Sequence, residues 1–142
     1  MDSLILSEKL ESLRRCIARV ETRRPASLAE LESDPDLQDI IVLNLTRSVQ
    51  ICVDIGSHIL SATDAVPPRS MGDVFNALER LGTISQATAL AMRKAVGFRN
   101  VAVHNYDVIS WAIVHAISHH QLEDFRRFAA EISARIPGAG TG

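Results

Sequence analysis

One segment of the sequence, residues 35–62, limits the fold more than any other, because it has helical length and is apolar on almost every side. Asp34 followed by Pro35 is typical of a helix start, with the aspartate as N-cap and proline in the first helical position. A helix that is apolar over most of its circumference is either central to its domain or shared with a partner subunit. The segment therefore predicts a long central helix, and it gives a first indication of an oligomer.

Apolar residues at helical spacing predict further helices before and after this segment. No run of alternating apolar and polar residues is long enough to predict a strand. We therefore expect an all-α fold, a single-domain helical bundle of four main helices plus short helices over residues 1–136, with a flexible tail at 137–142. An opening helix is expected from Leu4 to its end at Pro25, and short helices are expected at 28–33 and 71–81. Thr83 and Gln86 form a capping box that predicts a helix from 84 to beyond Val96. A last long helix is expected to begin with Asp107 as its N-cap.

The composition is that of a soluble globular protein, with 46% hydrophobic and 23% charged residues. No long uncharged apolar run predicts a transmembrane segment, and the N-terminus lacks the basic region and cleavage site of a signal peptide, so the expected compartment is the cytoplasm. The formal net charge of -2 argues against a wholly basic nucleic-acid binder and leaves room for a local basic site. Cys16 and Cys52 have neither metal nor disulfide spacing and are interpreted as small core residues.

Three groups of polar residues are weak candidates for chemistry. His115 and His119 share a helix face at a spacing that can bind a metal, but we favour a core or interface role because no carboxylate or cysteine completes the set nearby. Asp54 and His58, also one turn apart, are interpreted as a surface contact rather than an acid–base pair. The third group, interpreted mainly as a solvated face near the end of the first helix, consists of Arg14, Arg15, Arg19, Arg23 and Arg24.

A denser polar cluster lies in the segment GFRNVAVHNYD, between two helical flanks. Histidine can transfer protons near neutral pH, and arginine offers a fixed charge and a forked donor to phosphate. Cleavage of RNA without a metal requires these two functions. Arg99 and His104 are therefore candidate catalytic residues. Asn100 and Asn105 are candidates for orienting the phosphate or the imidazole. Tyr106 can stack on a base or hydrogen-bond a phosphate.

The spacing of the arginine and the histidine constrains the site. Five residues of a regular α-helix rotate by about 140°, so Arg99 and His104 do not share a face unless the helix distorts or ends inside the motif. The other possibility is a site completed by a second subunit, with both copies of the motif facing one cleft. Judged by residue types alone, the cluster fits equally well a helix C-terminus with a cation, a polar hinge and a capping tyrosine.

The same segment resembles the signature of a known family. Arg99, four residues, His104, one residue and Tyr106 are similar to the motif of the HepT-like toxins, which belong to the HEPN superfamily of helical ribonucleases. The asparagine after the arginine, the order of the helices and the chain length are similar as well. The resemblance therefore covers nearly the whole chain, and all three defining residues are present.

This resemblance implies a HEPN-like homodimer that acts as the toxin of a type VII toxin–antitoxin system. Its activity would be metal-independent endoribonuclease cleavage without a cofactor, in the cleft between the subunits. His104 would be the acid–base residue and Arg99 the phosphate ligand. Attack by the neighbouring 2′-hydroxyl would leave a 2′,3′-cyclic phosphate and a 5′-hydroxyl.

The resemblance also implies a partner, a minimal nucleotidyltransferase antitoxin (MntA-like), and no membrane association. This antitoxin would transfer AMP from ATP to Tyr106 and so keep RNA out of the cleft. The alternative hypothesis is a non-catalytic helical module that binds a nucleotide or presents its tyrosine to a separate nucleotidyltransferase.

Overall fold

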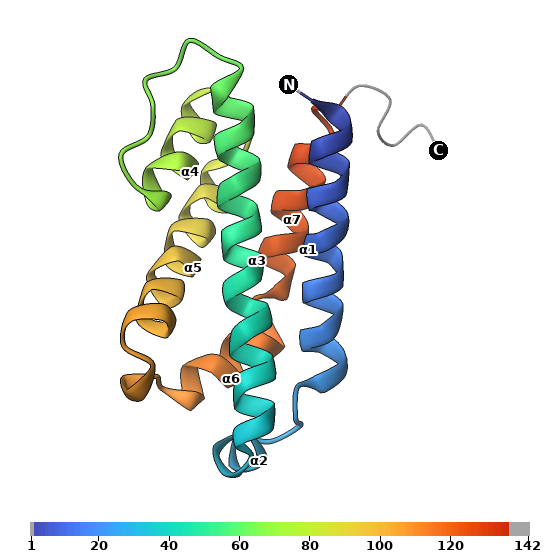
Figure 1. Ribbon diagram of the computed structural model, residues 1–142, viewed down its shortest axis with the longest axis vertical. Coiled ribbons are helices and arrows are strands. Elements are labelled where there is room, and N and C mark those ends of the chain that lie inside the picture. Colours follow the sequence, from blue (N-terminus) through green and yellow to red (C-terminus); the bar gives the residue numbers. More distant parts are fainter. Residues whose placement is uncertain (1, 137–142) are drawn as a thin grey trace.

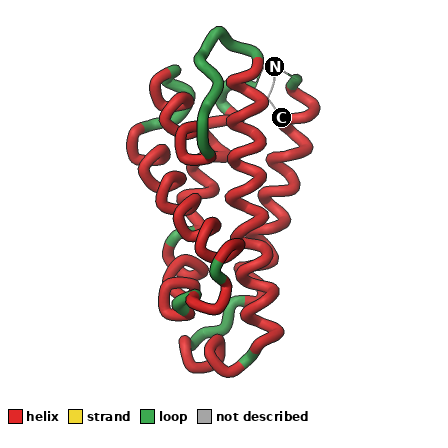
Figure 2. Tube along the Cα trace, turned by 60° about the vertical axis from the view of Figure 1, so that its left-hand side comes forward, coloured by secondary structure: helices red, strands yellow, loops and turns green. Residues whose placement is uncertain are grey.

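A computed structural model describes residues 2–136 of the chain, so the tail expected at 137–142 lies outside the described residues. Within this range the regular secondary structure is all helical, without strands, which confirms the all-α bundle (Figure 1 and Figure 2). In chain order the elements are α1 (Ser3–Arg23), α2 (Leu28–Ser33), α3 (Pro35–Ser61), α4 (Met71–Arg80), α5 (Gln86–His104), the short 3₁₀ helix η1 (Tyr106–Val108), α6 (Trp111–His120) and α7 (Leu122–Ser133).

The predicted central helix is α3, which runs the length of the molecule between α1 on one side and α4 and α5 on the other (Figure 1). Its start is the expected one, because the Asp34 carboxylate accepts hydrogen bonds from the backbone N–H groups of Asp36 and Leu37 at 3.0 and 3.1 Å. Most of its apolar residues are covered by the other helices of the same chain. The apolar character of α3 is thus explained within one chain and does not by itself indicate a second subunit.

By length and composition alone, α3 can cross a membrane, with a window of mean hydropathy 1.3. However, 56% of that window is buried inside the protein. A core helix of a soluble bundle has this combination of an apolar sequence and a covered surface.

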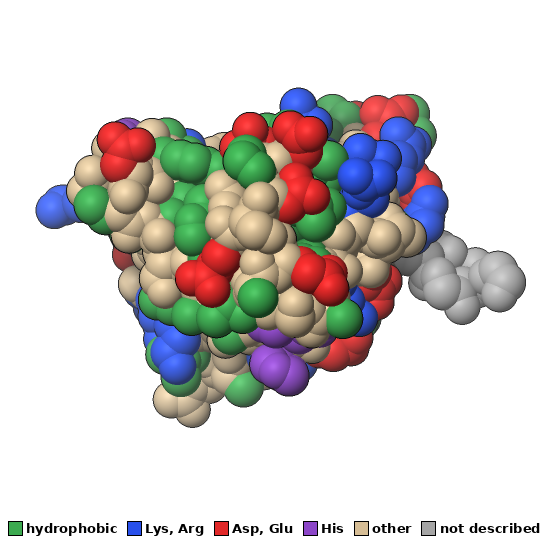
Figure 3. All heavy atoms as spheres, turned by 90° about the horizontal axis from the view of Figure 1, so that it is seen from below, with side chains coloured by type: hydrophobic (Ala, Val, Ile, Leu, Met, Phe, Trp, Pro, Cys, Tyr) green, Lys and Arg blue, Asp and Glu red, His purple; other side chains and the backbone are tan. Residues whose placement is uncertain are grey.

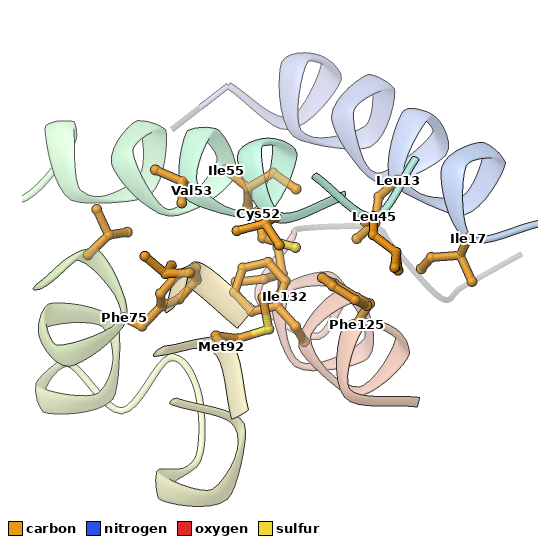
Figure 4. Packing of buried hydrophobic residues seen from close by; sticks show 14 of the residues in the cluster. Leu13, Ile17, Leu45, Cys52, Val53, Ile55, Phe75, Met92, Phe125 and Ile132 are labelled. Carbon is orange, nitrogen blue, oxygen red and sulfur yellow. The ribbon is translucent and has the colours of Figure 1, made fainter. Parts of the chain in front are cut away.

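The core lies where α1, α3, α4, α5 and α7 face one another (Figure 4). Each of these helices contributes fully buried side chains, and full burial of one such side chain stabilises the fold by about 1.5–3 kcal/mol. Cys52 is buried as expected, whereas Cys16 is only partly covered. Examples of the fully buried residues, in chain order, are Leu13, Cys52, Phe75, Met92 and Ile132.

The last long helix predicted from the sequence is interrupted, and this prediction was wrong. The structure has η1, α6 and α7 in its place, with Gln121 between the last two helices at a φ of -119° and a ψ of 5°. The bend lets α6 cross the lower end of α3, while α7 rises behind α3 beside α1 (Figure 1). The apolar residues of α6 and α7 continue in phase across the bend, so their spacing alone resembles one helix.

Two of the expected helix starts are also displaced. Ser110, not Asp107, is the N-cap of α6, and its Oγ accepts a 3.3 Å hydrogen bond from the backbone N–H three residues later. Ser85, not Thr83, is the N-cap of α5, with the corresponding hydrogen bond at 3.2 Å. In both cases the serine lies next to the first helical turn, whose free N–H groups need an acceptor.

Candidate functional site

The polar motif occupies the end of α5 and the turn that follows it, at the lower left of Figure 1. His104 is the last residue of the helix, and Asn105 leaves the helical conformation at a φ of -150° and a ψ of 49°. The Asn105 N–H still donates a 2.8 Å hydrogen bond to the Val101 carbonyl, and Tyr106 then opens η1. The motif is therefore held by helix and turn hydrogen bonds at the C-terminal end of α5.

Arg99 and His104 lie in one continuous helix, α5, which is α-helical between them. A regular helix turns them about 140° apart, so a single copy of the chain directs them to different sides. The Arg99 Nη1 donates a 3.3 Å hydrogen bond to the Asn100 Oδ1, and Arg99 forms no ion pair within residues 2–136. His104 is exposed and Arg99 half-buried, so both can be reached from solvent. The helix is not distorted between the two residues, and it ends inside the motif, directly after His104.

Tyr106 contacts residues from two other helices. Its hydroxyl donates a 2.8 Å hydrogen bond to the Oδ1 of Asp39 on α3, and its ring meets the edge of Trp111 with centroids 6.0 Å apart. Burial, followed by the hydrogen bond and the charge of Asp39, raises the pKa of Tyr106 from 10.0 to about 12. The side chain remains 38% exposed. Asp39 could not be singled out from the sequence, because an acid near the start of a helix is ordinary.

An apolar groove of about 530 Å³ lies between α5 and α6, beside the motif. Three of its lining residues are notably exposed for large apolar side chains: Val101 at 43%, Val108 at 64% and Ile113 at 56%. Seen from below, this end of the molecule shows hydrophobic side chains among acidic ones (Figure 3). A contiguous exposed apolar surface is typical of a surface that another molecule covers.

The histidine pair on α6 has structural contacts. The rings of His115 and His119 lie with their centroids 4.4 Å apart, and His119 Nε2 lies 2.8 Å from the Pro25 carbonyl oxygen. Beside it, Arg24 Nη1 donates a 2.7 Å hydrogen bond to the Ser118 carbonyl. These contacts fasten α6 to the end of α1, as the favoured structural interpretation predicts. In residues 2–136, three or more His, Cys, Asp or Glu side chains do not gather in a group suited to a metal ion.

The remaining candidates have separate contacts. Asp54 Oδ1 accepts a hydrogen bond from the Gln50 side chain at 3.0 Å, and His58 Nε2 accepts one from the Asp2 backbone N–H at 3.2 Å. The two side chains are therefore engaged with different neighbours, and the i,i+4 contact expected between them is not formed.

The first arginines of the cluster at the end of α1 are part of a solvated face. Arg14 and Arg15 both approach Glu11, at 2.5 and 3.6 Å, with exposed side chains. Exposed pairs of this kind contribute little to stability. The solvated-face interpretation is confirmed for these two residues.

Comparison with known proteins gives concordant matches over most of the chain. The model of a family described as Ribonuclease HepT-like matches residues 11–132. An mRNA nuclease HepT of Shewanella oneidensis is 35% identical over 92% of this chain and 97% of that protein. A solved structure of a tri-AMPylated Shewanella oneidensis HEPN toxin in complex with MNT antitoxin matches with a TM-score of 0.86 at 34% identity, over 94% of this chain and 99% of that one.

A second solved structure shows the same fold at much lower identity. YutE of Bacillus subtilis, a cytosolic protein of unknown function, has a TM-score of 0.81 at 13% identity, over 95% of this chain and 90% of that one. At this identity the match supports the helical architecture alone.

Proposed function

The chain belongs to the Ribonuclease HepT-like family, and from this premise we propose that it is the ribonuclease toxin of a toxin–antitoxin pair. The observation that carries the proposal is the motif at the end of α5, where an exposed His104 follows Arg99 by five residues inside the matched region. The relative that is described as an mRNA nuclease is covered almost completely, which supports an RNA substrate. We place this activity in the cytoplasm, in one domain over residues 1–136.

The proposed reaction is cleavage of RNA by its own 2′-hydroxyl. His104 takes the proton of the 2′-hydroxyl while that oxygen bonds to phosphorus, and it returns a proton to the 5′-oxygen as the phosphorus–oxygen bond breaks. Arg99 stabilises the charge that develops on the phosphoryl oxygens. Asn100 and Asn105 orient the phosphate or the imidazole. The products are a 2′,3′-cyclic phosphate and a 5′-hydroxyl, and no metal ion or cofactor takes part.

We propose that the active unit is a homodimer. In one copy the undistorted helix turns Arg99 and His104 about 140° apart, and a second copy related by a two-fold axis brings another motif to the same cleft. The apolar groove between α5 and α6 supports this arrangement, because it lies beside the motif and exposes Val101, Val108 and Ile113. A second copy of the chain is its proposed occupant.

The proposed off-switch is addition of AMP to Tyr106, by a nucleotidyltransferase antitoxin of the MntA type, as in a type VII system. The AMPylated toxin with its MNT antitoxin among the similar structures supports this assignment. Tyr106 is the single tyrosine of the chain and lies two residues after His104. The added phosphodiester carries a negative charge and repels RNA from the motif.

Incubation with the cognate antitoxin and ATP tests the switch. The wild-type chain is expected to gain the mass of AMP and to lose its RNA cleavage, whereas Tyr106→Phe gains no mass and keeps cleaving in the presence of the antitoxin and ATP. The same mass gain on Tyr106→Phe would place the acceptor elsewhere. Analysis of RNA ends tests the reaction, since 5′-phosphate and 3′-hydroxyl ends would contradict attack by the 2′-hydroxyl.

A further inference from the structure

We propose that Asp39 is the catalytic base of the AMP transfer, accepting the proton of the Tyr106 hydroxyl as this oxygen bonds to phosphorus. The inference rests on the proposed function, because it concerns the switch on the same motif. It assigns a chemical role in the modification to the toxin itself, in addition to that of the nucleotidyltransferase.

The geometry that carries the inference is the contact between the two side chains. Asp39 Oδ1 and the Tyr106 hydroxyl oxygen are 2.8 Å apart, within direct reach for proton transfer. The residues are 67 positions apart in the sequence, so the fold itself brings the carboxylate to the phenol. The Trp111 ring against Tyr106 restricts the direction in which the phenol points.

The carboxylate is available as an acceptor. No Lys, Arg or His side chain of residues 2–136 forms an ion pair with Asp39, and the hydrogen bond that its side chain makes within this range is the one from Tyr106. Both side chains are exposed on one side, so that a nucleotide held by a partner protein can approach the oxygen from solvent.

The reaction needs such a base because the phenol is a weak nucleophile while it holds its proton. The pKa of Tyr106 is raised to about 12 by burial and by Asp39, so the phenolate is scarce near neutral pH. In the proposed step the Tyr106 oxygen bonds to the α-phosphorus of ATP, the bond from that phosphorus to the β-phosphate oxygen breaks, and pyrophosphate leaves. The phenolic proton passes to Asp39, which later releases it to water.

The test compares Asp39→Asn with the wild-type chain. The asparagine keeps an oxygen acceptor for the Tyr106 hydroxyl but is not a base, so packing and hydrogen bonding are retained. Asp36→Asn is the matched control, since it removes the same charge from an exposed position one turn earlier in α3. Each variant is mixed with the cognate antitoxin and ATP, and the rate of AMP addition is followed by intact mass over a range of pH.

The inference predicts that Asp39→Asn slows AMP addition by about 100-fold or more, the usual contribution of a general base. The residual rate should rise steadily with pH, because it then depends on ionisation of the phenol alone. Asp36→Asn should follow the wild type in rate and pH profile. Wild-type rates for Asp39→Asn, or a slower rate with an unchanged pH profile, would overturn the role of base. If the wild-type chain itself gains no AMP, the proposed switch is wrong, and this inference with it.

Discussion

The hydroxyl of Tyr106 donates a 2.8 Å hydrogen bond to Asp39, which ties the turn after α5 to the first turns of α3. The contact links the residue proposed for modification to the central helix of the bundle. His104 precedes it by two residues, so the same contact fixes the backbone on which the proposed catalytic histidine sits. The relationship has consequences that can be measured on the unmodified protein.

The contact with Asp39 should change the pH at which Tyr106 titrates. Because the chain has one tyrosine, the ultraviolet absorbance of phenolate reports this residue alone. The midpoint should lie at about 12 in the wild type and fall toward 10.0 in Asp39→Asn, remaining above it because burial is the largest cause of the shift. The raised pKa stabilises the folded state fully below pH 10, and this contribution is lost as the pH rises to about 12. An unchanged midpoint in Asp39→Asn would show that Asp39 does not perturb the phenol.

Substitution of Arg99 tests the phosphate ligand. Removing one hydrogen-bond donor that stabilises a developing oxyanion lowers the reaction rate by a factor of about 10²–10³. Arg99→Ala should therefore reduce the rate of single-turnover RNA cleavage by this factor. Arg99→Lys should recover part of the rate, because lysine keeps the charge but lacks the fork. Arg19→Ala, on the exposed face of α1, is the control and should cleave as the wild type does. Equal rates for Arg99→Ala and the wild type would remove Arg99 from the site.

The apolar groove provides a test of the dimer. Ile113→Glu puts a carboxylate on a surface that the proposed partner copy covers, and burial of an unpaired charge is costly, so this variant should sediment as a monomer. Val66→Glu is the matched control in the loop between α3 and α4, away from the groove, and should remain a dimer. A dimeric Ile113→Glu would show that the groove is not the interface.

Chelation of metal ions distinguishes the proposed chemistry from metal-assisted hydrolysis. His104 and Arg99 supply the proton transfer and the positive charge, so RNA cleavage should continue at the same rate in excess EDTA. A strict requirement for an added divalent metal would contradict this mechanism. It would direct attention to His115 and His119, whose ring centroids lie 4.4 Å apart on α6.

The parts of the fold that the sequence predicted well depend on local signals. Asp34 and Pro35 start α3 where their pattern indicates, and its all-round apolar surface correctly places it at the centre. The break at Gln121 was missed because the apolar spacing of α6 continues in α7. A bend of this kind is decided by packing against α1 and α3, which no local pattern contains.

The residues of the candidate site also fall into those that the sequence predicts and those that only the fold brings together. The motif from Arg99 to Tyr106 was found from residue types and spacing, and its position at a helix end agrees with that analysis. Asp39 was not found, because its partner Tyr106 is 67 residues away and only the folded chain brings them together. The apolar groove was missed for the same reason, since one side comes from α5 and the other from the segment that runs from the end of η1 through α6.

The central claim is that His104 carries the proton transfer in RNA cleavage. Single-turnover cleavage by purified His104→Ala tests it most directly, with His120→Ala, an exposed histidine at the end of α6, as the matched control. We expect His104→Ala to lose at least about 100-fold in rate while it keeps the helical content and oligomeric state of the wild type. His120→Ala should cleave at the wild-type rate and leave 2′,3′-cyclic phosphate ends. Cleavage by His104→Ala at the wild-type rate would contradict the claim.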